Sequence, residues 1–333
     1  MSRAVLVTGG AGYIGAHACK ALARSGFQPV AFDNLGRGHR EAVRWGPLVE
    51  GDLADRPMID ATLARHQPVA VMHFAAHSNV GESISRPELY FRNNVVNSLN
   101  LFEALLAADN PPIVFSSTCA TYGLPETMPI VENLPQCPVN PYGESKLILE
   151  RMLEWIGQAH PLRHVALRYF NAAGADPDGE VGERHDPETH LIPLVLDAIA
   201  GRRPAIDIFG TDYPTPDGTA IRDYIHVQDL AEAHVRALDY LLAGGASVAL
   251  NLGTGIGHSV REVIKVAGSV TGRPVPCREA PRRAGDPPIL VADASRAEKL
   301  LRWKPELPDL DDIIGTAWRW QQKAGAGTGP ANP

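Results

Sequence analysis

A tyrosine and a lysine four residues apart, Tyr142 and Lys146, follow a proline in the segment NPYGESK. If a helix begins near Pro141, both side chains share one face, with Cβ atoms about 5–6 Å apart. Ionising a tyrosine near pH 7 needs a pKa shift of about 3 units, roughly the effect of one cation about 4 Å away at an effective dielectric near 20. Tyr142 is therefore a candidate general base and Lys146 the group that lowers its pKa. Taken alone, the same spacing also fits a solvated helix face.

Hydroxyl side chains end the strand predicted from PIVFSS, at Ser116, Ser117, Thr118 and Thr121. In open α/β sheets, ligands lie beyond the carboxyl ends of the strands. Thr118 is therefore expected to hydrogen-bond the reacting oxygen, whereas some of the other hydroxyls are expected to be ordinary strand-end caps.

A glycine-rich loop, VLVTGGAGYIG, follows the first predicted strand and opens a helix. Its spacing is GxxGxxG, and it places glycines where the backbone can turn tightly and approach a pyrophosphate at the helix N-terminus: Gly9, Gly12 and Gly15. We predict a dinucleotide site here.

Acidic and small residues end the next strands. Asp33 closes the second predicted strand and can accept hydrogen bonds from an adenosine ribose. A carboxylate there repels a 2′-phosphate and favours NAD over NADP, although Arg37 and Arg40 lie nearby. Asp52 and the run Phe74–Ala76 end the third and fourth predicted strands, where they either border the dinucleotide or serve as ordinary strand-end turn residues.

Short β-branched runs alternate with amphipathic helical patterns through the first half of the chain. Alternation of this kind predicts a parallel sheet with helices on both faces, a Rossmann-type, doubly wound α/β fold. Long helices are expected at 87–109 and 143–159. Turn-rich sequence after about Asn171 predicts a smaller, mixed α/β C-terminal substrate domain. We therefore expect an NAD-binding domain at 1–172, to which the chain returns around 222–255, and a substrate-binding domain at 173–333 with a disordered tail from about 323.

Composition excludes several classes of partner. The chain has 333 residues, a net charge of −7 and no stretch approaching the ~20 apolar residues that span a bilayer. We expect neither nucleic acid nor a membrane as partner. The scattered cysteines (Cys19, Cys119, Cys137 and Cys277) include no CxxC pair, which predicts reduced thiols and a cytoplasmic location.

Three weaker features have ordinary interpretations. NLGTGIG near Gly253 is interpreted as a strand-to-helix turn, and Ser259 to Glu262 has the spacing of a capping box. The stretch ERHDPETH offers His185, Asp186, Glu188 and His190 in irregular order, so we predict no metal site.

In combination, the motifs GGAGYIG, SSTCATYG, PYGESK, RYFN, RDYIHV and PRRAGD resemble the extended short-chain dehydrogenases/reductases, and among them the UDP-sugar 4-epimerases. The resemblance runs to about Gln322. It implies a catalytic trio of Thr118, Tyr142 and Lys146, tightly bound NAD, and inversion at C4 of UDP-glucose or UDP-galactose through a 4-keto intermediate. It also implies a homodimer formed through the two long helices.

By position, the resemblance assigns NAD contacts to Gly9, Gly12, Tyr13, Ile14, Gly15, Asp33, Asn34, Asp52, Leu53, Phe74, Ala75, Ala76, Ser78, Asn93, Ser116, Tyr142, Lys146 and Tyr169. It assigns substrate contacts to Thr118, Tyr142, Phe170, Asn171, His190, Leu191, Phe209, Arg222, Arg283, Asp286 and Leu290. Arginines suit the pyrophosphate of a UDP-sugar because guanidinium contacts can be bidentate.

Three departures from the family pattern matter. His190 replaces a frequent asparagine, and Ser78 replaces a lysine that some members direct at the cofactor. Leu290 occupies the position of the residue that limits the sugar pocket, which predicts poor acceptance of N-acetylated sugars.

Other activities stay open at this level. A 4-epimerase for UDP-xylose and UDP-arabinose, or dual hexose and pentose specificity, fits the same motifs. A net reductase and a non-catalytic NAD-sensing module are more distant. A 4,6-dehydratase is disfavoured because Cys119 and Ala120 stand where acidic residues would follow Thr118.

Overall fold

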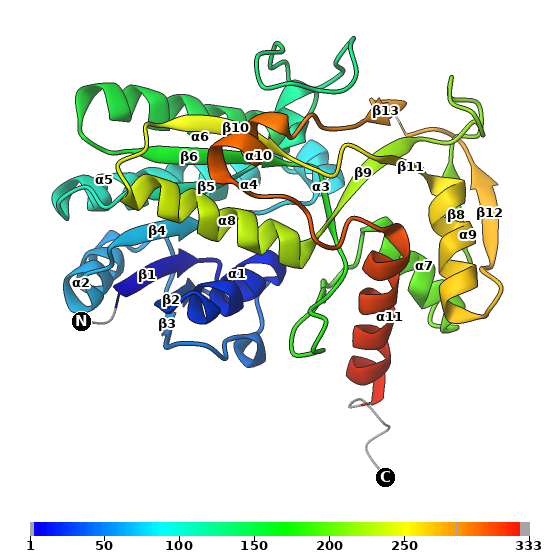
Figure 1. The fold of residues 1–333 in the computed structure, drawn as a ribbon, viewed down its shortest axis with the longest axis horizontal. Helices are drawn as coiled ribbons and strands as arrows, with labels where there is room; N and C mark the ends of the chain where they lie inside the picture. Colours follow the sequence, from blue (N-terminus) through cyan, green and yellow to red (C-terminus); the bar gives the residue numbers. More distant parts are fainter. Residues whose placement is uncertain (1–2, 284, 327–333) are drawn as a thin grey trace.

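The computed structural model describes residues 3–283 and 285–326. Its larger part is built on a seven-stranded parallel sheet in the order β10-β6-β5-β4-β1-β2-β3 (Figure 1). The strands are β1 (Arg3–Thr8), β2 (Phe27–Asp33), β3 (Leu48–Glu50), β4 (Ala70–His73), β5 (Ile113–Thr118), β6 (His164–Tyr169) and β10 (Val248–Leu252). The predicted doubly wound α/β fold is confirmed. Strand order reverses between β1 and β4, which is where ligands bind in such sheets.

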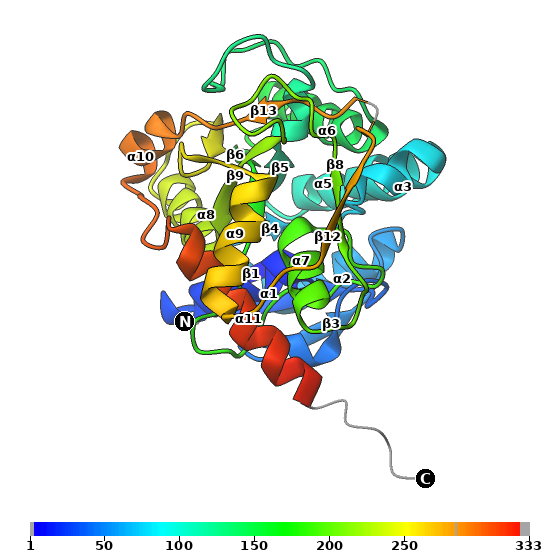
Figure 2. The same cartoon turned by 90° about the vertical axis from the view of Figure 1, so that its right-hand side faces the viewer.

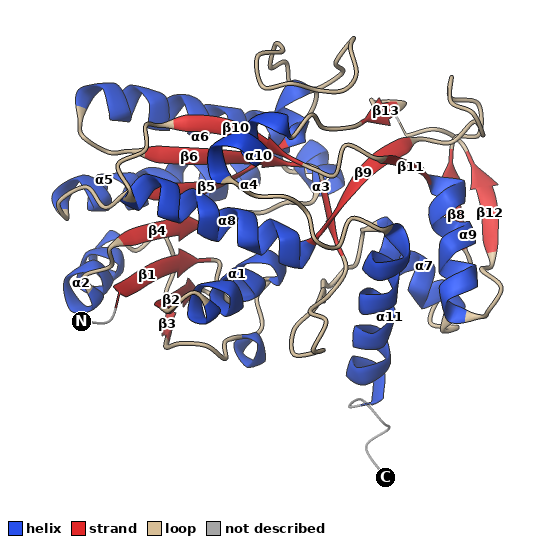
Figure 3. Ribbon diagram, viewed as in Figure 1, coloured by secondary structure: helices blue, strands red, loops and turns tan. Residues whose placement is uncertain are grey.

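Helices cover both faces of this sheet because its strands are apolar on both sides. In β1, Val5 and Val7 join the core under α1 (Tyr13–Arg24), α8 (Val227–Leu242) and α10 (Ser295–Leu301). Ala4 and Leu6 join the core under α2 (Arg56–His66), α5 (Asn97–Ala107) and α6 (Pro141–Ala159). Figure 3 separates these strands, in red, from the helices around them, in blue.

The helix predicted at 87–109 is divided in the structure. It consists of α4 (Pro87–Tyr90), a π-helical segment (Phe91–Val96) and α5, preceded by the short helix α3 (Val80–Ser85). The π-helical segment contains the buried Asn94, whose side-chain amide accepts from His77 N and donates to Ser145 Oγ. A local π turn of this kind re-aims one side chain without ending the helix.

The smaller part lies beyond the carboxyl ends of the large sheet (Figures 1 and 2). One sheet joins β7 (Asn171–Ala173), β9 (Ile221–His226), β11 (Gly257–Ser259) and β13 (Ile289–Leu290), and a second pairs β8 (Ile206–Phe209) with β12 (Cys277–Ala280). A separate core packs these strands against α7 (Leu191–Ile199), α9 (Val260–Thr271) and α11 (Leu310–Ala326).

The return of the chain to the large sheet is partly as expected. Within the expected return around 222–255, Val248–Leu252 form β10 of the large sheet, but Ile221–His226 form β9 of the smaller one. Asp223 in β9 explains this difference, because its buried carboxylate accepts from the backbone N–H groups of Thr254, Gly255 and Ala292. Those N–H donors lie beside β9 and hydrogen-bond the Asp223 carboxylate. The apolar faces of the large sheet would leave the same buried carboxylate without hydrogen bonds.

Two helix ends, the start of α9 and the end of α11, bear on expectations from the sequence. The capping box at the start of α9 is confirmed, since Ser259 Oγ accepts from Glu262 N and the Glu262 carboxylate accepts from Ser259 N. Helix α11 continues through Ala326, and the rest of the expected disordered tail lies outside the described residues. Within 3–283 and 285–326, the helices are all too short or too polar to cross a membrane.

Candidate active site

Helix α6 holds Tyr142 and Lys146 against the carboxyl end of β5. Asn140 caps the helix by accepting from Gly143 N at 2.9 Å, and Pro141 occupies its first turn. Both candidate side chains are buried. Lys146 Nζ donates to the Ser116 carbonyl at 2.7 Å and lies over the Phe115 ring, 5.0 Å from its centroid. The helix therefore places the pair in the interior rather than on a solvated face.

Burial controls the charge of this pair. It raises the pKa of Tyr142 well above its ordinary value, nearby Tyr169 adds to the rise, and a hydrogen bond with Thr118 opposes it. Burial also lowers the pKa of Lys146 to about 7, against the opposing charge of Glu150. Burial is the largest influence on the pKa of both groups, and the lowering of the tyrosine pKa by Lys146 stays a prediction.

A buried network beneath the pair escaped the sequence analysis. The Glu150 carboxylate accepts from Arg168 Nη2 at 2.6 Å and from Ser117 Oγ, and both charged side chains are almost fully buried. Arg168 Nη1 also donates to Tyr122 Oη at 2.9 Å. Spacing could have indicated Glu150, because it lies four residues after Lys146 and so on the same helix face.

The glycine loop at the end of β1 has the shape that a dinucleotide requires. A Cβ on Gly15 would lie 2.1 Å from the Gly9 carbonyl, and one on Gly9 would lie 2.7 Å from Ala75 N. At Gly12 an added Cβ would contact little besides Gly9 O, so the surface there is open to a ligand. Helix α1 has neither a side-chain cap nor an acidic residue in its first turn, which leaves its N–H groups available to an anion.

The acidic residues expected at the ribose end occupy the ends of β2 and β3. Asp33 accepts from Ala11 N at 3.0 Å and Leu35 N at 2.8 Å, so it also holds the glycine loop in place. Burial raises its pKa, and these two hydrogen bonds oppose the rise. Asn34 donates to the Asp52 carboxylate at 2.7 Å, and Leu53 directly follows Asp52 in the chain.

The other expected cofactor contacts follow β4, β5 and β6. Phe74 N donates to Thr8 O, which brings the Phe74–Ala76 run against the glycine loop. Ser116 Oγ and Tyr169 Oη lie 2.5 Å apart, and burial raises the Tyr169 pKa to about 12. The remaining expected positions are Tyr13 and Ile14 in the first turn of α1, Ser78 before α3, and Asn93 in the π-helical segment.

The expected pyrophosphate contacts form one charged group in the smaller part. Asp286 lies between two arginines, as an ion-pair partner of Arg222 and at 2.9 Å from Arg283 Nη2. The Arg283 guanidinium lies 5.2 Å from the ring centroid of Phe209. Leu290 in β13 pairs in register with Arg222 in β9.

The other expected substrate contacts divide into two places. Phe170 packs with Leu290 in a small apolar cluster next to β5, and Asn171 opens β7. His190 precedes α7 and Leu191 begins it. The His190 side chain is directed to Glu183 rather than left free.

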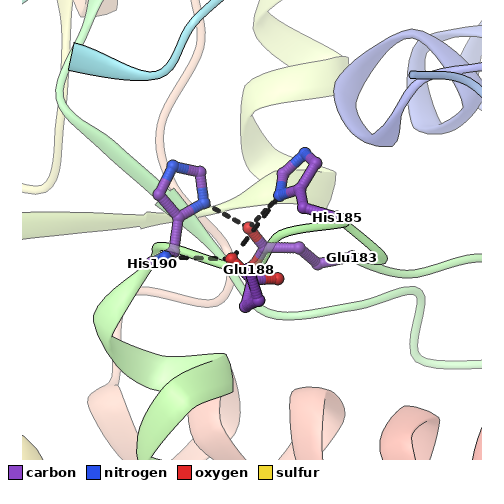
Figure 4. Close-up of side chains that lie close together, drawn as sticks. All are labelled: Glu183, His185, Glu188 and His190. Carbon is purple, nitrogen blue, oxygen red and sulfur yellow. Dashed lines mark hydrogen bonds and ion pairs between the residues drawn. The ribbon is translucent and has the colours of Figure 1, made fainter. Parts of the chain in front are cut away.

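The stretch for which we predicted no metal site folds into a compact group. Glu183, His185, Glu188 and His190 each offer a ligand atom, and these atoms lie within 4.8 Å of one another (Figure 4). Asp186, which the sequence offered in place of Glu183, is outside the group. A turn brings the four together, and their spacing in the sequence gave no sign of it.

Comparisons with known proteins agree with this geometry. Residues 5–253 match the NAD dependent epimerase/dehydratase family. A UDP-glucose 4-epimerase of Rhizobium leguminosarum bv. trifolii is 54% identical over 320 residues, which cover 96% of this chain and 98% of the relative.

Two solved structures are closely similar. The UDP-glucose 4-epimerase of Brucella ovis in complex with NAD superposes with a TM-score of 0.94 at 52% identity, covering 96% of this chain and 98% of that one. The UDP-glucose 4-epimerase of Stenotrophomonas maltophila, with bound NAD and formylated UDP-arabinopyranose, gives 0.95 at 41% identity, covering 98% and 100%. The chain is therefore a member of the NAD-dependent epimerase/dehydratase family.

Proposed function

We propose that this protein is an NAD-dependent 4-epimerase that interconverts UDP-glucose and UDP-galactose. One observation carries the proposal: α6 places Tyr142 and Lys146 beside Thr118, at the carboxyl end of the sheet that also bears the glycine loop. The similarity to UDP-glucose 4-epimerases over nearly the whole chain supports it. NAD is the cofactor, in agreement with the family and with the open glycine loop.

The proposed division of labour follows the two parts of the chain. Residues 1–172, with the returning segment around 222–255, bind NAD. Residues 173–333 bind the UDP-sugar, with Arg222 and Arg283 on its pyrophosphate. Asp286 holds both guanidinium groups in place before substrate arrives, which reduces the cost of ordering them on binding.

Tyr142 is the proposed base for the hydroxyl at C4. Bound NAD would supply reversible hydride transfer at C4, with return of the hydride to the opposite face of the 4-keto sugar and no net oxidation. The tyrosine pKa is high in the protein alone, so the phenolate requires added positive charge beside it. Lys146 is poised to supply part of that charge, because its own pKa near 7 responds to small changes in its surroundings. Thr118 orients the reacting oxygen through its hydroxyl.

A Tyr142→Phe variant tests the role of the base. The substitution removes the group that exchanges the proton, and the ring still fills the same space. We expect NAD to remain bound and the epimerisation rate to fall on the order of 10²-fold or more. Near-normal turnover would exclude Tyr142 as the base.

Pentose sugars are the second candidate. The Stenotrophomonas maltophila structure, 41% identical to this chain, holds a formylated UDP-arabinopyranose. The deciding experiment offers the purified protein UDP-galactose and UDP-xylose separately without added cofactor, and separates the product sugars by chromatography. Turnover of the hexose pair supports the first proposal, and turnover of the pentose pair alone overturns it.

Equal turnover of UDP-GalNAc and UDP-Gal would contradict a restrictive role for Leu290 in the sugar pocket.

We also propose a homodimer formed through α5 and α6 and their neighbours. Large apolar side chains are exposed on these helices, including Val96 at the end of the π-helical segment, Leu99 in α5 and Trp155 in α6, which is 71% exposed. An unpartnered apolar surface of this kind commonly marks an interface. Sedimentation equilibrium should give twice the chain mass, and a monomer at micromolar concentration would contradict the proposal.

The four free cysteines fit the reducing cytoplasm as the location of the protein.

A further inference from the structure

The segment between β7 and α7 folds so that four ionisable side chains meet. His185 Nδ1 lies 3.1 Å from Glu183 Oε1 and 3.6 Å from Glu188 Oε1, and His190 Nδ1 contacts the same Glu183 oxygen. Figure 4 shows both rings turned toward the two carboxylates. Two imidazoles and two carboxylates are thus directed at one point from a stretch of eight residues.

These separations match those of ligands around a small divalent cation. Zinc bonds to nitrogen and oxygen are about 2.1 Å long, so neighbouring ligands of a tetrahedral site lie about 3.4 Å apart. The 3.1 Å and 3.6 Å separations lie on either side of that value. The contact between His190 Nδ1 and Glu183 Oε1 is shorter, so the His190 ring must move away from Glu183 to admit an ion between the four atoms.

The surroundings hold the ligands in place. Glu188 Oε1 accepts from the backbone N–H groups of Thr189 at 2.7 Å and His190 at 2.9 Å, and the Tyr13 ring packs edge-on against His185. The side chain of Glu183 is 6% exposed and that of His190 is 47% exposed. The group is thus closed at its base and open on one side, as an entry path for an ion requires.

A second acidic group in the same region provides the contrast. Asp176, Asp178 and Glu180 also converge, but Lys20 Nζ occupies their centre at 2.6–2.8 Å from each. Within the described part of the chain, the ion pairs of Glu183 and Glu188 are with the two histidines alone, and no lysine or arginine joins them.

We propose that Glu183, His185, Glu188 and His190 bind one zinc ion. Imidazole with carboxylate suits zinc and other late first-row divalent cations, whereas magnesium and calcium prefer all-oxygen sites. This assignment replaces the expected role of His190 as a substrate contact and does not depend on which sugar the enzyme uses.

The ion would fasten a segment that already contacts the loop after β2. His39 Nε2 lies 2.9 Å from the Arg184 carbonyl, and Arg37 donates to the Asp186 carbonyl at 3.1 Å. Arg184 in turn pairs with Glu41 at 2.6 Å. Zinc bound at the base of this segment would therefore stabilise the junction between the loop after β2 and the smaller part.

The test is a zinc titration of the full chain with its NAD. The protein is treated with EDTA, exchanged into metal-free buffer and titrated with zinc chloride against a chromophoric chelator. We expect one zinc per chain and a rise in the thermal unfolding midpoint. His185→Gln should weaken zinc binding at least tenfold, and so should Glu183→Gln. Magnesium at millimolar concentration should not compete.

Two matched controls and a spectrum complete the experiment. Asp186→Asn changes an acid of the same segment outside the group, and His160→Gln removes a histidine at the end of α6, so both should bind zinc as the wild type does. X-ray absorption at the zinc edge should show nitrogen and oxygen ligands only. Absence of binding, binding unchanged in both ligand variants, or sulfur in the coordination shell would each overturn the proposal. Loss of zinc together with intact turnover would leave the epimerase proposal untouched.

Discussion

Lys20 and Lys146 are both buried lysines, 5% and 3% exposed, yet their surroundings shift their pKa values in opposite directions. Burial disfavours the charged form of Lys20, but its hydrogen bonds to Asp176, Asp178 and Glu180 outweigh it and raise the pKa. Lys146 contacts a carbonyl and an aromatic face, and burial lowers its pKa to about 7.

The difference separates a structural cation from the proposed catalytic one. Lys20 in α1 joins the helix behind the glycine loop to the segment after β7, and three carboxylates fix its charge. Lys146 has no carboxylate in direct contact among the described residues, so its protonation can change with what binds beside it. A buried cation surrounded by acids stabilises one charge state, whereas one without them remains near the point of titration.

Replacing Lys146 by methionine should give the largest effect on the reaction. The charge proposed to support a Tyr142 phenolate is lost, so we expect kcat to fall about 10³-fold. The unfolding midpoint should stay the same or rise, because a poorly compensated buried amine is removed. Initial rates and thermal unfolding on the same preparation would measure both. A rate within tenfold of wild type would place Lys146 outside the chemistry.

Lys20→Met should show the reverse pattern. It leaves Asp176, with a side chain 2% exposed, as a buried charge without its partner, and we expect a loss of about 3 kcal/mol in the free energy of unfolding. Turnover per folded molecule should remain close to wild type. Lys323→Met is the matched control, since its exposed ammonium reaches the same segment at the Gly179 carbonyl. Equal stability of the two variants would show that Lys20 has no special structural role.

Sequence reasoning worked for the Lys146 side of this comparison because local rules apply there. Glycine spacing after a strand, an acid at the end of β2 and a Tyr–Lys pair at helical spacing together indicate one edge of a parallel sheet. The apolar runs of the sequence predict the strands themselves, whereas the order of the strands and the burial of Tyr142 are findings of the structure.

The same reasoning failed where contacts join distant segments. Nothing near Lys20 predicts that residues 176–180 surround it, because more than 150 positions separate them. The assignment of β9 depended on loop donors for Asp223, and the meeting of Glu183 with His190 depended on a turn. Composition and periodicity contain no information on such pairings, which require the folded chain.

Acid should destabilise the protein through buried histidines that, like Lys146, form no ion pair among the described residues. His73, His226 and His234 are almost fully buried, and burial lowers their pKa values to about 3, 3 and 4. Between those values and about 6.5 the unfolded chain binds more protons, so stability falls as the pH drops below about 6.5. Each histidine should cost about 2 kcal/mol at pH 5.

Urea unfolding at pH 7 and pH 5 measures this loss. In His73→Gln, the free energy of unfolding should differ less between pH 7 and pH 5 than in the wild type. The substitution removes one group that must remain neutral in the folded protein. Equal unfolding midpoints of the wild type at the two pH values would mean that these histidines are protonated without cost in the folded state.

Asp178→Asn should give the smallest effect and so shows which acid fixes Lys20. The Asp178 side chain is 58% exposed, and its pKa is lowered mainly by the hydrogen bond from Lys20. Exposed ion pairs contribute little because water solvates both charges well. We expect an unfolding midpoint indistinguishable from wild type, whereas Asp176→Asn should lower it clearly because Asp176 is the buried partner of Lys20. If both substitutions destabilise the protein equally, the number of acids around Lys20, rather than their burial, holds this junction together.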